Sequence, residues 1–247
     1  MADPDDSFIT AARLRPEISQ SWRRSLMSGL RPDSGVRLEA SMDIDRRGRL
    51  QIAAAPVLDQ LALELADTGF GILLADSRAR IIARRFGERR LETAFDRAGI
   101  AIGSLFLEET TGTNSIATAF ELRRGCAVLG EEHYIESFKG FSCYGHPLIS
   151  RVTGRLEGVL DISCPAHLAN PLLGPFLARA AREIESQLLL GAREAEQRLL
   201  ADGRGRRAAC GGRVRGGGRH GQRQGHGTPG PLRSRGAARP GRRPAGA

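Results

Sequence analysis

Two alternating stretches near the middle of the chain restrict its fold more than any other feature. Phe141–Ile149 is rich in aromatic and aliphatic residues, and a short turn at Arg151–Gly154 joins it to Leu156–Ser163. In the second stretch one face carries Leu156, Gly158, Leu160 and Ile162, and the other carries Glu157, Val159, Asp161 and Ser163. Alternation with a period of two around a short turn predicts an antiparallel β-hairpin.

Further strands are predicted on both sides of this hairpin. Phe70–Ala75 and Ile81–Phe86 flank a polar loop and suit a second hairpin. Cys126–Leu129 is a short apolar run between two glycines, and His133–Phe138 alternates, so both are predicted to be strands.

Apolar residues at helical spacing mark several amphipathic helices. They recur in Ile18–Leu26, in Leu50–Leu65, in Leu91–Ala98 and in a long segment that starts after Asn170 and Pro171. Thr113 or Asn114 can cap a shorter helix that includes Ile116 and Phe120. Antiparallel strands with these helices predict an α+β fold in which helices cover one face of the sheet.

Four ordered blocks of this sequence resemble a known family. GTNSIATAF (112–120), GEEHY (130–134), FSCYGHPLI (141–149) and GRLEGVLDIS (154–163) are similar to the GAF sensor domain of acetoin- and glycerol-type bacterial activators, the Fis-family enhancer-binding proteins. The likeness extends to SWRRSLMSGLRPD (21–33) and LLADSRARII (73–82), and covers residues 10 to 195. Two departures are Ser104–Phe106, where the family usually has a Trp, and Ala79, where the turn usually carries a Gly.

The resemblance implies a GAF-like domain at 50–200, preceded by a helical segment and connector at 1–49 and followed by an Arg/Gly-rich tail at 201–247. Such a domain implies sensing of a small alcohol, diol, ketone or aromatic effector, or the action of a partner protein. The helices at Leu50–Leu65 and Leu173–Leu199 could pair in a homodimer or lie against the molecule's own sheet. Contact with DNA is expected only through an output domain that this sequence does not contain.

Charge is distributed unevenly along the chain. From Gly203 onward there are 12 Arg and no acidic residue, whereas residues 1–202 carry a net charge of −3. Gly, Arg, Ala and Pro make up 36 of the last 45 residues, so we expect a disordered tail. An Arg/Gly tail could bind nucleic acid through phosphates, although it contains no Phe or Tyr for stacking.

The abrupt change of composition favours a second hypothesis for the tail. The chain has 36 Arg and a single Lys, Lys139, as expected of a GC-rich gene. We therefore interpret the tail as translation out of frame or as a degraded gene, in which a normal relative continues into an ATPase and a helix-turn-helix domain. No GxxxxGK[ST] motif is present, so ATP hydrolysis by this chain is not expected.

The candidate effector-binding residues are Asn114, His133, Cys143 and Asp161, the polar groups of the family blocks expected to face a pocket. Each also has a structural explanation: a helix cap, a core histidine, a small apolar residue and an acceptor for loop amides. We predict no catalytic residue, no metal and no cofactor.

Two alternatives to sensing remain open. His133, Cys143 and His146 could hold a metal, but Cys143 and His146 would point to opposite faces of a regular strand. Cys126, Cys143 and Cys164 could serve a redox enzyme similar to free methionine sulfoxide reductase, which needs an activated thiolate. With no disulfide framework, signal peptide or long apolar run, we expect a cytoplasmic protein that does not contact a membrane.

Overall fold

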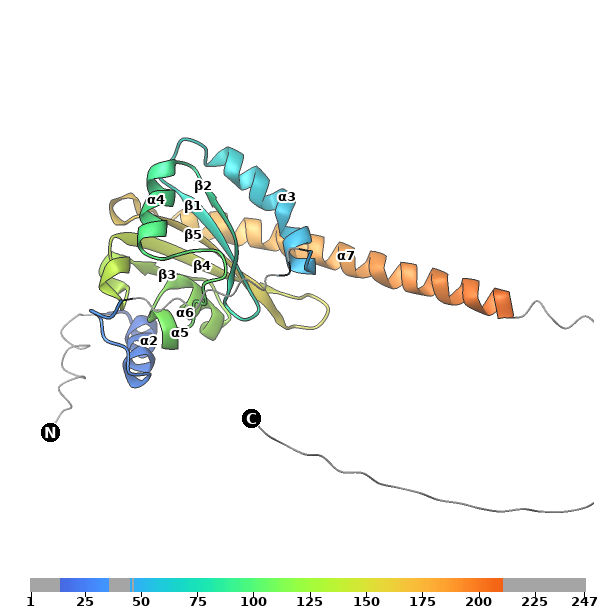
Figure 1. The fold of residues 1–247 in the computed structure, drawn as a ribbon, viewed down its shortest axis with the longest axis horizontal. Helices are drawn as coiled ribbons and strands as arrows, with labels where there is room; N and C mark the ends of the chain where they lie inside the picture. The colour runs from blue at the N-terminus through green and yellow to red at the C-terminus, as the bar shows by residue number, and fades with distance from the viewer. Residues whose placement is uncertain (1–13, 36–44, 46, 211–247) are drawn as a thin grey trace, which may run out of the picture. The chain divides into compact units, whose positions relative to one another are not determined.

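The computed structural model describes residues 14–35, 45 and 47–210, with side chains described as far as residue 200. Its centre is a five-stranded antiparallel sheet with the strand order β2-β1-β5-β4-β3 (Figure 1). The strands are β1 (Gly71–Asp76), β2 (Ile81–Phe86), β3 (Cys126–Leu129), β4 (Phe141–Ile149) and β5 (Leu156–Pro165). Both predicted hairpins and the short strand at Cys126 are confirmed.

Helices cover both faces of the sheet, so the prediction of a single covered face was wrong. On one face lie α3 (Arg49–Glu64) and the first half of α7 (Leu173–Cys210). The other face is covered by α2 (Pro16–Met27), α4 (Arg89–Arg97), α5 (Glu108–Thr111) and α6 (Ser115–Leu122). The reason is the strand composition: β1 and β5 are buried along nearly their whole length, which requires cover on both sides.

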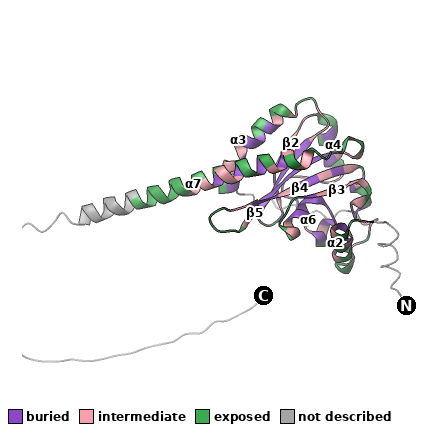
Figure 2. Cartoon of the chain, turned by 180° about the vertical axis from the view of Figure 1, so that it is seen from behind, coloured by how far each residue is buried: buried purple, intermediate pink, exposed green. Residues whose placement is uncertain are grey.

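Each face of the sheet has its own hydrophobic core, and buried residues follow the strands closely (Figure 2). The α3 and α7 face is built on Leu74, Leu160 and Ile162, while Leu73 and Val159 belong to the opposite face. The alternation predicted for β5 is therefore confirmed. The apolar stripes of α3 and α7 lie against the molecule's own sheet.

The N-terminal helix α2 is part of the second core. Ile18 and Trp22 are buried there, and the Trp22 ring meets the Tyr134 ring edge-on at 5.3 Å between centroids. A domain boundary at 49/50 stays a prediction. The connector between α2 and α3 falls mostly at 36–44, outside the described residues.

The segment predicted as a strand at His133–Phe138 has a different structure. Two 3₁₀ turns, η1 (Gly130–Glu132) and η2 (Glu136–Phe138), flank three consecutive buried residues: His133, Tyr134 and Ile135. These turns on either side interrupt the extended backbone that a strand requires. The left-handed φ of 48° at Gly130 starts the turn, and the His133 ring bonds back to the carbonyl of Gly130.

Helix α7 begins at Leu173, later than the predicted cap pair. Asn170 instead closes a preceding turn, in which its side chain accepts a hydrogen bond from the amide of Leu172 at 2.9 Å. The helix continues to Cys210, past residue 200, and the rest of the expected disordered tail lies outside the described residues. Within the described part of the chain, no helix combines the length and apolarity needed to cross a membrane.

The turn between β1 and β2 explains the departure at Ala79. Ala79 has a φ of 59°, the left-handed conformation that favours glycine. Its methyl group is fully buried in the core that contains Phe106. An alanine is therefore compatible with the turn because burial of its methyl group offsets the backbone strain.

Candidate functional site

All four predicted site residues line one small hollow on the α6 side of the sheet. Asn114 comes from the start of α6, His133 from the segment between η1 and η2, Cys143 from β4 and Asp161 from β5. The hollow has a volume of about 20 Å³, and its other lining residues are mainly apolar. The structure thus brings the four residues together, while their binding of a ligand stays a prediction.

Asp161 is the centre of the polar part of this hollow. Its carboxyl group is fully buried, accepts a hydrogen bond from Ser115 Oγ, and accepts another from Ser163 Oγ at 2.6 Å. Burial raises the pKa of Asp161 to about 7, and the two serine bonds partly oppose that rise. Among the described lining residues there is no Lys or Arg to pair with this carboxyl group.

Cys143 and His133 are both neutral groups at this site. Cys143 Sγ lies 3.1 Å from Ser163 Oγ, and burial raises the pKa of its thiol well above the usual value. The His133 ring is buried, with Nδ1 3.0 Å from the carbonyl oxygen of Gly130, and burial lowers its pKa to about 4. Neither group supplies charge near neutral pH.

Asn114 performs the capping role foreseen from sequence. Its Oδ1 accepts a hydrogen bond from the amide of Ala117 at 2.9 Å. Its Nδ2 donates to Thr111 Oγ1 and to the carbonyl of Gly112, both at 2.9 Å. The side chain therefore fixes the start of α6, which carries Ser115 towards Asp161.

Several residues of the site were missed by sequence reasoning. Ser163 shares a face with Asp161 in the predicted hairpin, so alternation alone could have found it. Ser115 and the four phenylalanines that fill the hollow come from separate elements and carry no motif of their own; the rings are Phe95, Phe106, Phe138 and Phe141. Their convergence depends on tertiary packing.

An ion pair with a buried carboxylate holds α2 behind the site. Arg24 donates to both carboxylate oxygens of Glu108, a residue only 3% exposed, and Ser21 Oγ donates to the same carboxylate at 2.5 Å. Ser21 Oγ also lies 2.7 Å from Thr113 Oγ1, next to Asn114. Arg24 therefore has an intramolecular role.

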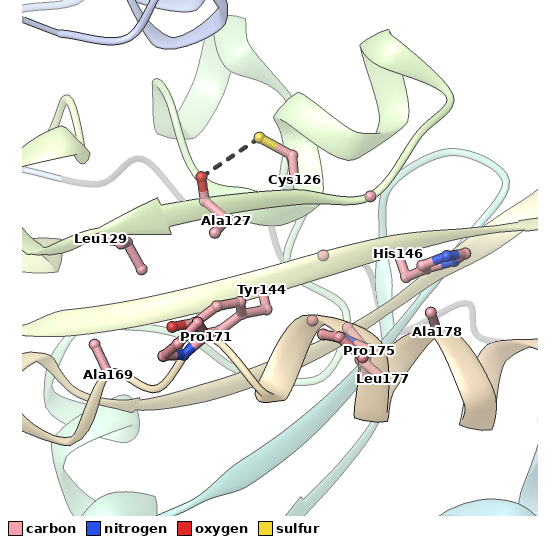
Figure 3. Close-up of a pocket in the computed structure, with 13 residues that line it drawn as sticks. Cys126, Ala127, Leu129, Tyr144, His146, Ala169, Pro171, Pro175, Leu177 and Ala178 are labelled. Carbon is pink, nitrogen blue, oxygen red and sulfur yellow. Dashed lines mark hydrogen bonds between the residues drawn. The ribbon is translucent and has the colours of Figure 1, made fainter.

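A second and larger hollow lies on the opposite face of the sheet. It is a groove of about 580 Å³ between β3, β4 and the beginning of α7, with His146 and Tyr144 on its floor and Pro175 and Ala178 on its wall (Figure 3). Most of its lining is apolar. His146 and Cys143 thus belong to different hollows, as their odd spacing on β4 predicts.

The three cysteines whose side chains are described show no sign of an activated thiolate. Burial raises the pKa of Cys126 and of Cys164 to about 11, so their thiols are poorer nucleophiles than a free cysteine. The described cysteines are all free. In the described part of the chain, His, Cys, Asp and Glu side chains form no group of three that could hold a metal ion.

A five-stranded antiparallel sheet with helices on both faces and a small polar-centred hollow on one of them defines a GAF-like sensory domain. The sequence matches the family described as "MimR, N-terminal domain" over residues 6–186. This match covers most of the chain, and the chain belongs to that family. The matched region includes helix α2.

Similar proteins are bacterial transcriptional activators. The propane 2-monooxygenase operon activator MimR of Mycolicibacterium smegmatis is 34% identical over 200 residues, which cover 79% of this chain and 34% of the relative. The acetoin dehydrogenase operon activator AcoR of Bacillus subtilis is 30% identical, over 79% of this chain and 33% of the relative. The chain therefore spans about a third of the length of these activators.

One solved structure shares the fold. The E. coli DhaR(N)–DhaL complex contains a chain that superimposes with a TM-score of 0.70 at 18% identity, covering 76% of this chain and 66% of that chain. This likeness agrees with the GAF-like architecture predicted from the sequence blocks. The family and its relatives make this chain a regulatory domain of the kind found in transcriptional activators.

Proposed function

We propose that the chain senses a small neutral molecule in the hollow around Asp161 and that it acts as a regulatory rather than a catalytic domain. The observation that supports this proposal most directly is the convergence of Asn114, His133, Cys143 and Asp161 on one mostly apolar hollow. The raised thiol pKa values argue against the redox alternative.

The ligand class follows from the polarity of the hollow and from the operons that the relatives activate. Asp161 retains acceptor capacity beyond its two serine bonds, and its protonated form can donate to a carbonyl. The surrounding phenylalanine rings favour an alkyl group. MimR and AcoR activate operons for propane 2-monooxygenase and acetoin dehydrogenase, so a short-chain alcohol, ketone or hydroxyketone is the class that we propose for this chain.

The proposed output is a shift in how the flanking helices pack against the sheet. Helices α3 and α7 contact β1 and β5, and Asp161 lies on β5 between residues that belong to the α7 core. In a protein of the length of its relatives, this shift would reach a DNA-binding output domain. We place this activity in the cytoplasm. We also propose that a second copy of the chain or a partner protein regulates it.

The proposal is tested by measuring the binding of acetoin and 2-propanol to the full chain with ligand-observed NMR. We expect Asp161→Ala to weaken binding at least tenfold, because it removes the only buried carboxyl group among the described lining residues. His146→Ala is the matched control, since it changes the groove on the other face. Binding lost in His146→Ala and kept in Asp161→Ala would assign the ligand to the groove and reject the proposed site.

A further inference from the structure

We propose that the rings of Phe106 and Phe138 set the largest ligand that the Asp161 hollow admits, an inference that rests on the proposed sensing function. The hollow of about 20 Å³ is filled on one side by these rings, which are 3% and 2% exposed. A space of that size holds about one water molecule. Any larger ligand must displace part of the wall.

The strand and helix walls are the least able to yield. Helix α6 lies directly on β4, because a Cβ atom added at Gly145 would be 2.3 Å from the carbonyl oxygen of Ser115. Strands β1, β4 and β5, which carry Leu73, Cys143 and Asp161, are each hydrogen-bonded to two neighbours. Moving them would break backbone ladders on both sides.

The other two phenylalanines of the hollow belong to a separate ring cluster. Phe95 of α4 meets Phe86 at 5.2 Å and Phe141 at 4.8 Å, in edge-to-face contacts. Phe141 is itself in β4. Displacing Phe95 would therefore disturb two aromatic contacts, and Phe141 is held by its strand as well as by its contact with Phe95.

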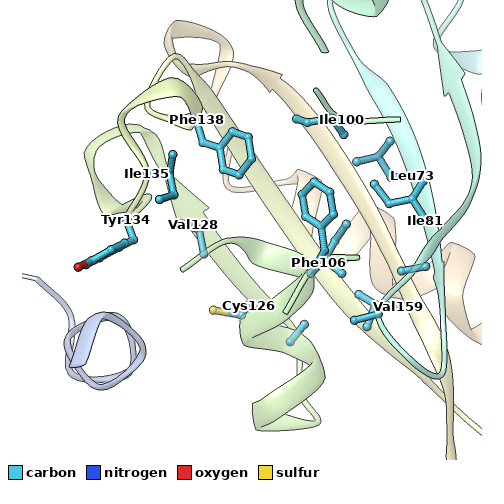
Figure 4. Packing of buried hydrophobic residues seen from close by; sticks show 14 of the residues in the cluster. Leu73, Ile81, Ile100, Phe106, Cys126, Val128, Tyr134, Ile135, Phe138 and Val159 are labelled. Atoms are coloured by element: carbon cyan, nitrogen blue, oxygen red, sulfur yellow. The ribbon is translucent and has the colours of Figure 1, made fainter. Parts of the chain in front are cut away.

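Phe106 and Phe138 instead belong to segments outside the regular elements. Phe106 precedes α5, and Phe138 ends the 3₁₀ turn η2, whose hydrogen-bond geometry is weaker than that of an α-helix. Their rings are stacked with 6.0 Å between centroids and 15° between planes. Figure 4 shows the two rings extending towards the same space from separate segments.

Phe106 and Phe138 therefore form the part of the wall that a ligand can displace at least cost. The volume of their rings limits how far the hollow can widen. The wild-type hollow would admit molecules of a few non-hydrogen atoms, such as 2-propanol. Apolar cavities of roughly 150 Å³ bind benzene-sized molecules. Removing either ring would thus open the hollow to an aromatic alcohol such as phenol, whose hydroxyl group can bond Asp161.

The test compares 2-propanol and phenol as probes of the full chain by calorimetry and ligand-observed NMR. The variants are Phe106→Ala and Phe138→Ala, with Phe106→Leu and Phe138→Leu as milder changes that keep the core apolar. Phe86→Ala is the matched control, because Phe86 contacts Phe95 and does not line the hollow. Circular dichroism verifies that each variant is folded.

We expect phenol to bind the alanine variants at least tenfold more tightly than wild type, with a smaller gain in the leucine variants and none in Phe86→Ala. Phenol binding to wild type as tightly as to the variants, or no gain in any folded variant, would overturn the size limit. If phenol binds the variants while 2-propanol does not bind wild type, the size limit stands and the proposed sensing function fails.

Discussion

Asp161 is a carboxyl group in surroundings that do not favour its charge. It is fully buried, bonded to two serine hydroxyl groups, and has a pKa raised to about 7 from an ordinary value of 3.8. Between these two values the folded chain holds a proton that the unfolded chain has lost. The contribution of Asp161 to stability is therefore complete below pH 4 and declines as the pH rises to about 7.

Replacing Asp161 by Asn should remove this loss of stability at higher pH. We expect Asp161→Asn to be more stable than wild type at pH 8, by on the order of 2 kcal/mol, because an amide carries no buried charge. Its oxygen can accept from one serine hydroxyl group, while its NH2 group donates to the other. Urea unfolding at pH 8 measures the difference. Asp59→Asn is the control, since the Asp59 side chain is 64% exposed and should change stability little. Equal stability of Asp161→Asn and wild type at pH 8 would mean that Asp161 carries no such penalty.

His133 has the opposite pH dependence. Burial lowers its pKa to about 4 from 6.5, so the unfolded chain binds a proton that the folded chain does not, and stability rises with pH between these values. In wild type the contributions of His133 and Asp161 oppose each other over this range. We expect Asp161→Asn to reveal the His133 dependence as a rise in unfolding temperature from pH 4 to 6.5, measured by thermal scans. Parallel curves for wild type and Asp161→Asn would contradict the assignment for Asp161, and a flat curve for Asp161→Asn would contradict the assignment for His133.

At the scale of elements, α2 is joined to the sensory core by a buried carboxylate. Glu108 pairs with Arg24, whose side chain is 41% exposed, and also accepts from Ser21. Removing one partner leaves a buried charge without its counterpart, which costs more than removing both.

We expect Arg24→Ala to destabilise the chain by about 2 kcal/mol, and the double change Arg24→Ala with Glu108→Gln to destabilise it less. Urea unfolding measures stability, and hydrogen exchange of the α2 amides shows whether the helix detaches. Arg31→Ala is the matched control, because Arg31 pairs with Asp33 on an exposed surface. If Arg31→Ala lost as much stability as Arg24→Ala, the burial of Glu108 would not explain the effect of Arg24→Ala.

Elements that depend on interactions between residues close in the sequence were predicted, and those that depend on distant residues were not. The β4–β5 hairpin and the Asn114 cap follow from local alternation and capping, and both were predicted. The segment around His133 alternates like a strand, yet the turn at Gly130 and the contacts with Trp22 of α2 determine its structure. Arg24–Glu108 joins residues 84 positions apart, and no local pattern predicts that pairing.

The candidate site shows the same division. The four polar residues were found because a family resemblance supplied their blocks, and alternation placed Asp161 and Ser163 on one face. The phenylalanines that limit the hollow come from α4, β4 and two irregular segments, so their meeting is a property of the tertiary fold.

At the scale of the whole molecule, the apolar stripe of α7 is not available for pairing with a second copy. Leu177, Ala180 and Ile184 of α7 are buried against the chain's own sheet. A second apolar surface remains: a groove of about 680 Å³ between the start of α3 and the later part of α7, next to Ile52, Leu190 and Leu199. These three side chains are 65%, 50% and 73% exposed.

We expect a second copy of the chain to cover this surface, because three exposed apolar side chains lie together on it and a two-fold axis would let the same surface of each copy cover the other. Light scattering after size exclusion should show a dimer for wild type and a monomer for Leu190→Glu with Leu199→Glu. Val152→Glu, a change at another exposed apolar residue in the β4–β5 turn, should remain a dimer. A monomeric wild type at tens of micromolar would contradict this prediction and would leave the groove free for another partner.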